Sequence, residues 1–294
     1  MKKICIRCGI AYGALLIAFT VYLLLDTFVI PRTYSVAESD TFEQEDTMLT
    51  LVGVLHEYDD GDLAMTVTAY RGFDSDIYVA EIQLSSPSQL KTALAKDTYG
   101  KNIKEQPSVM AERNNAILAI NGDYYGAQER GYVLRNGVIY RNTRSKGQKD
   151  LVIYRDGAFG IINEQDVSLQ ALLDDGAVQV LSFGPALLEN GEIAVKQNEL
   201  RGKDKTRNPR TAIGHTDDLH YFFIVADGRT DESEGLTILE LAEVMDYFDI
   251  EIAYNLDGGG SSCMVFQGEI VNSPTATGNK FREREVSDIV YVGR

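Results

Sequence analysis

Residues 251–266 read EIAYNLDGGGSSCMVF and place a polar loop between two apolar segments. The apolar segments 252–254 and 263–266 predict two strands, because aromatic and β-branched residues favour extended backbone. The three consecutive glycines 258–260 have access to positive φ, and their bare N–H groups can form a nest that binds an anion. A tight hairpin needs only two loop residues. The longer run of small and polar residues therefore predicts a functional loop.

Two other predicted strands end in similar residues. The strand 116–120 is followed by Asn-Gly-Asp-Tyr-Tyr-Gly at 121–126, and the strand 219–226 is followed by Asp227-Gly-Arg229. In the first loop Asn255 and Asp257 likewise precede the glycines. Amides, carboxylates and glycines at the ends of several strands are typical of a shared site, although each motif alone is also explained by a turn.

The segment 201–210, RGKDKTRNPR, is the one basic stretch of an otherwise acidic domain. Its lysines are typical of a solvated loop. Arg210 differs, because Pro209 fixes its approach and the predicted strand 211–214 follows directly. Two histidines, 215 and 220, flank a predicted turn and do not indicate a zinc site.

The N-terminal residues differ from the rest of the chain. An apolar run at 10–30 is long enough to cross a bilayer core of about 30 Å as a helix. Basic residues precede it, so the positive-inside rule predicts a cytoplasmic segment 1–9, a transmembrane signal anchor 10–30 and an acidic spacer 31–49. A cleaved signal peptide is the alternative, with residues 35–37 as the cleavage site. Both interpretations put residues 50–294 outside the cytoplasm, in an extracytoplasmic domain.

The net charge is −16, and it is −19 without residues 1–32. Such a domain repels polyanions, so nucleic acid and anionic lipid surfaces are not expected partners. Of the three cysteines, only Cys263 lies in the predicted external domain, which excludes an intrachain disulfide there.

The pattern of elements favours a domain with much antiparallel sheet. Asn-Gly or Asp-Gly pairs at 136–137, 156–157 and 190–191 predict hairpins. Further expected elements are strands at 65–70, 77–82 and 286–292, helices at 87–94 and 107–114, and a helix at 238–248 capped by Thr237.

Taken in order, the motifs resemble the phosphodiester glycosidase family. They are Asn121-Gly-Asp-Tyr-Tyr, Pro209-Arg210-Thr-Ala-Ile-Gly, Asp227-Gly-Arg229, the helix after Thr237, and Asn255-Leu-Asp257-Gly-Gly-Gly-Ser-Ser. The family includes the lysosomal uncovering enzyme and bacterial proteins linked to exopolysaccharide. The resemblance covers residues 65–294. It implies an α+β fold with mixed, largely antiparallel sheets and helices packed on the outside.

The resemblance also implies hydrolysis of the bond between a sugar anomeric carbon and phosphate, in exopolysaccharide or cell-wall glycan metabolism. The catalytic candidates are Asn121, Asp123, Asp227, Asn255 and Asp257. The candidates for binding substrate and phosphate are Tyr124, Tyr125, Arg210, Arg229, Gly258, Gly259, Gly260, Ser261 and Ser262. The sequence does not assign the acid, base or nucleophile among the three aspartates.

Arginine suits the phosphodiester because its planar fork donates two parallel hydrogen bonds. Carboxylates suit the oxocarbenium-like centre of glycoside hydrolysis. No cofactor is expected to be required. Two alternatives remain open at this level: a metal-dependent phosphodiesterase that uses calcium or magnesium, and a polysaccharide-binding module without catalysis.

Overall fold

The computed structural model describes residues 15–22, 49–198, 200–276 and 281–294. Those from Leu49 onward belong to one compact unit, Thr47–Arg294. Within the described part of the chain, no helix is long and apolar enough to cross a membrane. Only residues 15–22 of the predicted anchor 10–30 are described, and they are helical. Segments 1–9 and 31–48 lie outside the described residues entirely.

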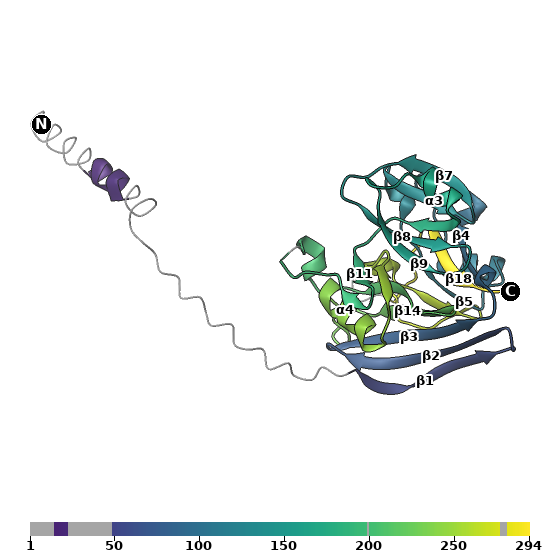
Figure 1. The fold of residues 1–294 in the computed structure, drawn as a ribbon. Coiled ribbons are helices and arrows are strands. Elements are labelled where there is room, and N and C mark those ends of the chain that lie inside the picture. Colours follow the sequence, from purple (N-terminus) through teal and green to yellow (C-terminus); the bar gives the residue numbers. More distant parts are fainter. Residues whose placement is uncertain (1–14, 23–48, 199, 277–280) are drawn as a thin grey trace, which may run out of the picture. The chain divides into compact units, whose positions relative to one another are not determined.

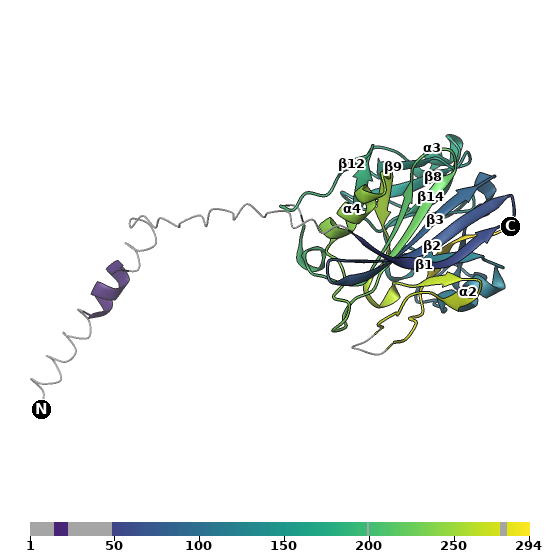
Figure 2. The ribbon, with the colours of Figure 1, turned by 90° about the horizontal axis from the view of Figure 1, so that it is seen from below.

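The largest sheet has eight strands in the order β1-β2-β3-β14-β13-β15-β11-β12. In Figure 1 its first three strands lie along one edge of the domain, and Figure 2 shows them from below, running side by side. The bounds in sheet order are β1 (Thr50–Asp59), β2 (Leu63–Gly72), β3 (Ser75–Leu84), β14 (His220–Ala226), β13 (Arg210–His215), β15 (Ile252–Asn255), β11 (Ala186–Glu189) and β12 (Glu192–Ile193).

Two five-stranded sheets complete the domain. One contains β7 (Val138–Thr143), β6 (Gly131–Arg135), β10 (Ala177–Leu181), β8 (Lys149–Tyr154) and β9 (Phe159–Asn163). The other contains β17 (Glu269–Ile270), β16 (Met264–Phe266), β5 (Leu118–Asn121), β18 (Asp288–Val292) and β4 (Leu90–Leu94). Every pairing between these described strands is antiparallel, which confirms the largely antiparallel fold.

The three sheets share one buried core. It contains Ile82 and Phe223 from the eight-stranded sheet, Ile120 and Val290 from the sheet of β5, and Ile153 from the sheet of β8. These side chains are removed from water, and that burial is the main stabilising contribution to such a fold. The outer faces of the sheets carry the helices.

Each helix of the unit from Leu49 onward covers a separate apolar cluster. α4 (Ile238–Tyr247) packs Leu241 and Met245 on the eight-stranded sheet, α2 (Pro107–Arg113) packs Met110 on the sheet of β5, and α3 (Leu169–Asp174) packs Leu172 on the sheet of β10. α4 begins with a capping box, in which the Thr237 hydroxyl accepts from the Glu240 N–H and the Glu240 carboxylate accepts from the Thr237 N–H. The prediction of helices on the outside is confirmed.

Several element predictions need correction. The segment expected as a helix from Pro87 to Leu94 is a single 3₁₀ turn, Pro87–Gln89, followed by strand β4. β4 pairs with β18 along its whole length, and this ladder overrides the helical preference of LKTAL. Strand β1 and helix α3 were not predicted. α3 is only six residues long, which is too short for a clear helical pattern in the sequence. Ser168 caps it by accepting from the Ala171 N–H.

The domain buries two acidic side chains next to each other, Asp150 and Glu164. The Ser182 hydroxyl donates to Glu164 at 3.2 Å. Burial, and next the neighbouring Glu164, raise the pKa of Asp150 to about 9. The pair therefore holds a proton in the folded state at neutral pH, with the Asp150 carboxyl as its carrier.

This proton makes stability depend on pH. Because the folded pKa of Asp150 lies above its unfolded value of about 4, its contribution is fully present below about pH 4. It is lost as the pH rises towards about 9. Asp150→Asn replaces the carboxyl with an amide that stays neutral at every pH, so we expect a higher Tm than wild type at about pH 8 and no gain at about pH 4. Thermal unfolding across this range checks the expectation, and a pH-independent difference would contradict it.

Candidate functional site

The site forms where strands of two sheets end next to each other. Ala212 of β13 pairs with Asn255 at the end of β15, and Arg210 pairs with Ala226 at the end of β14. β16, which follows the 256–263 loop, pairs with β5. The fold therefore brings the three predicted strand-end loops to one place.

The loop 121–126 is bonded directly to the glycine loop. The Asn121 side-chain amide donates to the Asp257 carbonyl at 2.5 Å, and the Asp257 N–H donates to the Gly122 carbonyl at 3.1 Å. The Asn121 side-chain oxygen accepts from the Thr211 hydroxyl at 2.8 Å and from the Cys263 N–H at 3.2 Å. With all its polar atoms used in this way, Asn121 holds the loop in place.

Four buried polar atoms at the end of β15 and in the loop that follows it have no hydrogen-bond partner of their own. They are Asn255 Oδ1, Asp257 Oδ2, Ser261 Oγ and Ser262 Oγ. Among the described residues five other buried side-chain atoms lack a partner, two of them on Asp150, but they are spread over four residues that lie far apart in the sequence. A buried polar group without a partner costs stability. Such a cluster indicates groups reserved for a ligand.

Asp257 is the carboxylate that belongs to this cluster of unpartnered atoms. Its burial is the largest influence on its pKa and raises the pKa of Asp257 above the ordinary range. The Ser261 hydroxyl and the positive charge of Arg284 act in the opposite direction. A desolvated carboxylate with a free oxygen has the properties of a general base or acid.

Asp123 and Asp227 are placed differently. Asp123 is fully buried and forms an ion pair with Arg135 at 2.8 Å; its other contacts include the Tyr125 and Ser182 N–H groups. Asp227 accepts from the Asn272 amide at 2.8 Å and from the Ser273 N–H at 2.9 Å. Both carboxylates are thus occupied in joining loops behind the site. Their positions favour supporting roles over direct contact with substrate.

Arg135 connects Asp123 to a further carboxylate, Asp288. Its Nη2 atom lies 2.8 Å from an oxygen of each aspartate, and its Nε donates to Asp288 at 3.1 Å. Burial, followed by the negative charge of Asp123, raises the pKa of Asp288. The Asp123 N–H also donates to Asp288, at 3.2 Å. This buried ion network fixes the backbone from which the 121–126 loop turns.

The three glycines allow close packing on three sides. A Cβ at Gly258 would lie 2.9 Å from the Pro209 carbonyl oxygen, and one at Gly260 would lie 2.8 Å from Ala276 Cα. Gly259 has a φ of 63°, and a Cβ there would meet Arg229 Nη2 at 2.7 Å. These contacts explain why glycine is needed at each position.

The N–H groups of the loop are largely used inside the protein. Gly259 donates to Pro209 at 2.7 Å, Ser261 to Gly258 at 3.3 Å and Ser262 to Gly259 at 3.2 Å. The predicted anion-binding nest of N–H groups is therefore not the main feature of this loop. The main features of this loop are the free hydroxyls and the neighbouring guanidinium groups.

Two arginines stand on either side of the Pro209 turn. Arg210 is buried and donates to the backbone carbonyls of Leu236, Lys203 and Thr206 at 2.8 to 3.0 Å. Burial lowers the pKa of Arg210 to about 10, so its charge remains at neutral pH. Arg229 is exposed, donates to the Asn208 side-chain oxygen at 3.1 Å and lies against Gly259. Among the described residues Arg229 forms no ion pair, so its charge is available to a ligand.

The two tyrosines of the 121–126 loop face different surroundings. Tyr124 is half-buried between two cations, with Lys104 Nζ 5.1 Å and the Arg284 guanidinium carbon 5.8 Å from its ring centroid. Tyr125 is buried and stacks on Tyr99 at a centroid distance of 5.2 Å. Tyr124 therefore belongs to the candidate site, and Tyr125 belongs to the core.

Arg284 and Lys104 were not predicted as site residues. Arg284 stands in the charged run Arg-Glu-Arg-Glu at 282–285, where alternating signs are typical of an exposed segment. Only the fold shows that this arginine approaches Asp257 closely enough to offset part of the rise in its pKa. The described residues contain no group of three His, Cys, Asp or Glu side chains that could hold a metal ion.

The comparisons with known proteins agree with this fold and these motifs. The family model for phosphodiester glycosidases matches residues 114–293. The chain belongs to the phosphodiester glycosidase family. The N-acetylglucosamine-1-phosphodiester alpha-N-acetylglucosaminidase of Mus musculus is 31% identical in an alignment of 181 positions that covers 55% of this chain and 34% of that protein. The SPbeta prophage-derived uncharacterized protein YomE of Bacillus subtilis is 26% identical over 180 residues, 60% of this chain and 28% of that protein. The chain therefore spans about a third of the length of these relatives.

A solved structure shows the same fold over most of the chain. It is the catalytic domain of zebrafish N-acetylglucosamine-1-phosphodiester alpha-N-acetylglucosaminidase, auto-inhibited by its pro-peptide. The TM-score is 0.66 at 21% sequence identity, and the match covers 84% of this chain and 88% of that one.

Proposed function

We propose that this protein hydrolyses a glycosyl phosphodiester between the anomeric carbon of a sugar and the phosphate oxygen. The observation that carries the proposal is the cluster of four unpartnered polar atoms at 255–262, beside two guanidinium groups, in a chain of the phosphodiester glycosidase family. These groups match the two parts of such a substrate. The hydroxyls and amide suit a sugar, and the arginines suit a phosphate.

The reaction uses Asp257 and water. A water molecule attacks the anomeric carbon and gives up its proton to the Asp257 carboxylate. The bond between the carbon and the phosphate oxygen breaks, and its electron pair leaves with the phosphate. The products are a free sugar and a phosphate monoester. Negative charge near the anomeric carbon also stabilises the oxocarbenium-like transition state.

The charge that develops on the leaving phosphate needs nearby cations. Arg229 lies against Gly259, and Arg284 acts electrostatically on Asp257. Each can donate two hydrogen bonds to a phosphate group. A phosphate monoester leaves readily once it is stabilised in this way, so the chemistry asks little of a separate general acid.

Substrate and location are part of the proposal. The name of the mouse relative suggests N-acetylglucosamine as the first sugar to try. The sequence pattern supports an anchored protein with its domain outside the cytoplasm, acting on exopolysaccharide or wall glycan. Chelation tests for a divalent cation such as calcium or magnesium, and loss of activity that the added cation restores would favour the metal-dependent alternative.

A panel of glycosyl phosphodiesters tests the function. We expect release of reducing sugar from at least one diester, and Arg284→Ala lowers kcat/KM about tenfold or more because one charge-assisted contact to phosphate is lost. Lys205→Ala, in the exposed basic loop, is the matched control and retains wild-type activity. Equal losses in both variants would mean that only the diffuse positive field matters. Retained glycan binding with no turnover of any diester would favour the binding module.

A further inference from the structure

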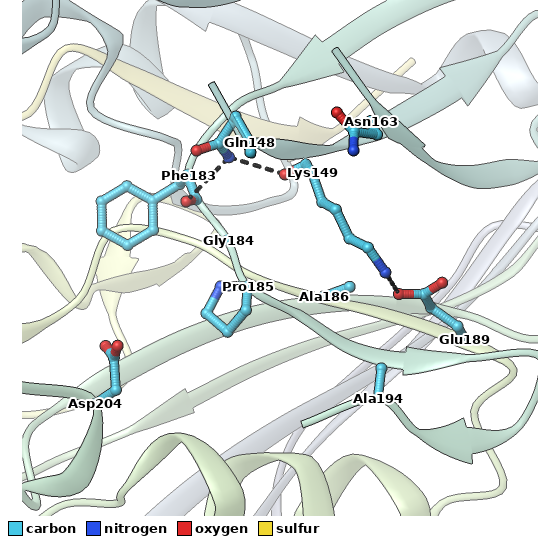
Figure 3. Close-up of a pocket in the computed structure, with 11 residues that line it drawn as sticks. Gln148, Lys149, Asn163, Phe183, Gly184, Pro185, Ala186, Glu189, Ala194 and Asp204 are labelled. Atoms are coloured by element: carbon cyan, nitrogen blue, oxygen red, sulfur yellow. Dashed lines mark hydrogen bonds and ion pairs between the residues drawn. The ribbon is translucent and has the colours of Figure 1, made fainter. Parts of the chain in front are cut away.

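The buried acids Asp150 and Glu164 lie behind the candidate site and have no part in the proposed reaction. Both side chains are fully removed from solvent. Lys149, the residue before Asp150, and Phe183 line a pocket of about 620 Å³ that is drawn in Figure 3. Gly184 of the same pocket accepts a hydrogen bond from the Asn255 amide at the end of β15. The acid pair is therefore close to a wall of the site.

The hydrogen bonds around the pair show which acid carries its proton. One oxygen of Glu164 accepts from the Tyr132 N–H at 2.8 Å and from the Ser182 hydroxyl at 3.2 Å, and its other oxygen accepts from the Ser145 N–H. Neither oxygen of Asp150 has a hydrogen-bond partner among the described residues. Three donors thus stabilise the ionised form of Glu164, and none stabilises that of Asp150. The proton therefore belongs to Asp150.

Ser182 joins this pair to the loop 121–126. Its hydroxyl donates to Glu164, and its N–H donates to the Asp123 carboxylate at 2.7 Å. Asp123 accepts in turn from the Tyr125 N–H at 3.1 Å. A displacement of Glu164 is therefore transmitted to the 121–126 loop through a short chain of hydrogen bonds.

A second connection leads from the same region to Asp257. The Tyr254 hydroxyl donates to the Lys149 carbonyl at 2.8 Å and accepts from the Phe183 N–H at 2.9 Å. Tyr254 belongs to β15 and stands three residues before Asp257. Both chain segments beside the acid pair are therefore bonded to the strand that carries the proposed base.

The surroundings of the pair do not neutralise a second negative charge. Within the described part of the chain, no cation forms an ion pair with Asp150 or Glu164. Two ionised carboxylates here would repel each other strongly, because burial removes the screening by water. The ionisable side chains that face the pair are those of Asp123, Tyr132 and Tyr254, while Arg135 is bound to Asp123 and Asp288, Lys149 to Glu189 and Arg144 to the Tyr132 hydroxyl.

We infer that Asp150 and Glu164 are positioning residues: with one proton between them they hold Ser182 and the 121–126 loop in the arrangement that turnover needs, and loss of this proton lowers turnover. The inference rests on the proposed function. Burial, and next Glu164, raise the pKa of Asp150 to about 9, so the proton is present at neutral pH and is lost in alkaline solution. The pair thus sets the alkaline limit of activity, and Asp257 sets the acidic limit.

The pH profile of turnover tests this inference. Because a group with a pKa of about 9 must stay protonated, wild-type kcat/KM on the best diester of the panel should be about fourfold lower at about pH 9.5 than at about pH 7.5. Asp150→Asn has no proton to lose there, so its two values should agree within about twofold. Asp150→Ala is a second variant with the same expected profile. Asp166→Asn removes an exposed acid two residues after Glu164 and should keep the wild-type profile.

Hydrogen exchange tests the positioning without turnover. After correction for the intrinsic exchange rate, the wild-type amides of 121–126 and 182–184 should be less protected at about pH 9.5 than at about pH 7.5, and Asp150→Asn should keep their protection. An alkaline loss of activity that Asp150→Asn shares, or a wild-type rate that does not fall, would overturn the inference and leave the proposed function intact. If no diester is hydrolysed, the proposed function fails, and exchange alone decides: equal wild-type protection at both pH values would contradict the role of the pair.

Discussion

Asp257→Asn is expected to lower kcat by about 100- to 10,000-fold, the range that general base catalysis contributes. The asparagine keeps the size of the side chain but cannot take a proton from water. Because burial raises the pKa of Asp257, the ionised carboxylate costs stability in the folded state at neutral pH. The variant should therefore be at least as stable as wild type. Initial rates on the best diester of the panel, with thermal unfolding in parallel, measure both properties.

The pH profile and a control variant sharpen this expectation. The base acts in its ionised form, so wild-type kcat/KM should fall as the pH drops through a value above the ordinary aspartate pKa of about 4. Asp227→Asn is the control, because it weakens the contacts to Asn272 and Ser273 and should mainly lower the Tm. If Asp257→Asn kept a tenth or more of the activity, Asp257 would not be the base.

Arg135→Met is expected to destabilise the domain by about 3–5 kcal/mol, the cost of breaking a buried ion pair. It leaves the carboxylates of Asp123 and Asp288 buried next to each other without their shared cation. The urea midpoint of unfolding measures the loss. Asp288→Asn in the Arg135→Met background should recover part of it, since one of the two like charges is then removed.

The contrast with a surface pair tests the physical reason. Lys101 and Glu129 also lie within ion-pair distance, at 2.6 Å, but both are exposed. Lys101→Met should leave the urea midpoint of unfolding nearly unchanged, because solvent screens this exposed pair. Similar losses in Arg135→Met and Lys101→Met would show that burial does not determine the strength of the Arg135 network.

Local sequence signals predicted much of the fold. Asn136-Gly137 and Asn190-Gly191 have positive φ at both residues and connect paired strands, as their turn chemistry requires. Thr237 and Glu240 form the expected cap of α4. β4 could not be predicted in this way, because its strand conformation depends on pairing with β18, almost 200 residues later. Such long-range pairing leaves no local pattern.

The sequence predicted where the site lies but not which role each of its aspartates has. Asp123, Asp227 and Asp257 all follow strands and all precede a turn residue, so the sequence makes them equivalent. Their partners distinguish them: Arg135 and the N–H groups hold Asp123, while one oxygen of Asp257 is left free. Those partners come from distant elements. The approach of Arg284 to Asp257 is a similar consequence of the tertiary fold.

The position of bond cleavage is the most direct test of the proposed function. The preferred diester is hydrolysed in 18O-labelled water, the products are reduced with borohydride at once, and mass spectrometry locates the label. Cleavage between the anomeric carbon and oxygen predicts that the label enters the sugar and not the phosphate monoester. Label in the phosphate would show attack at phosphorus, as in a metal-dependent phosphodiesterase, and would contradict the assignment of Asp257 as the base that directs water to the anomeric carbon.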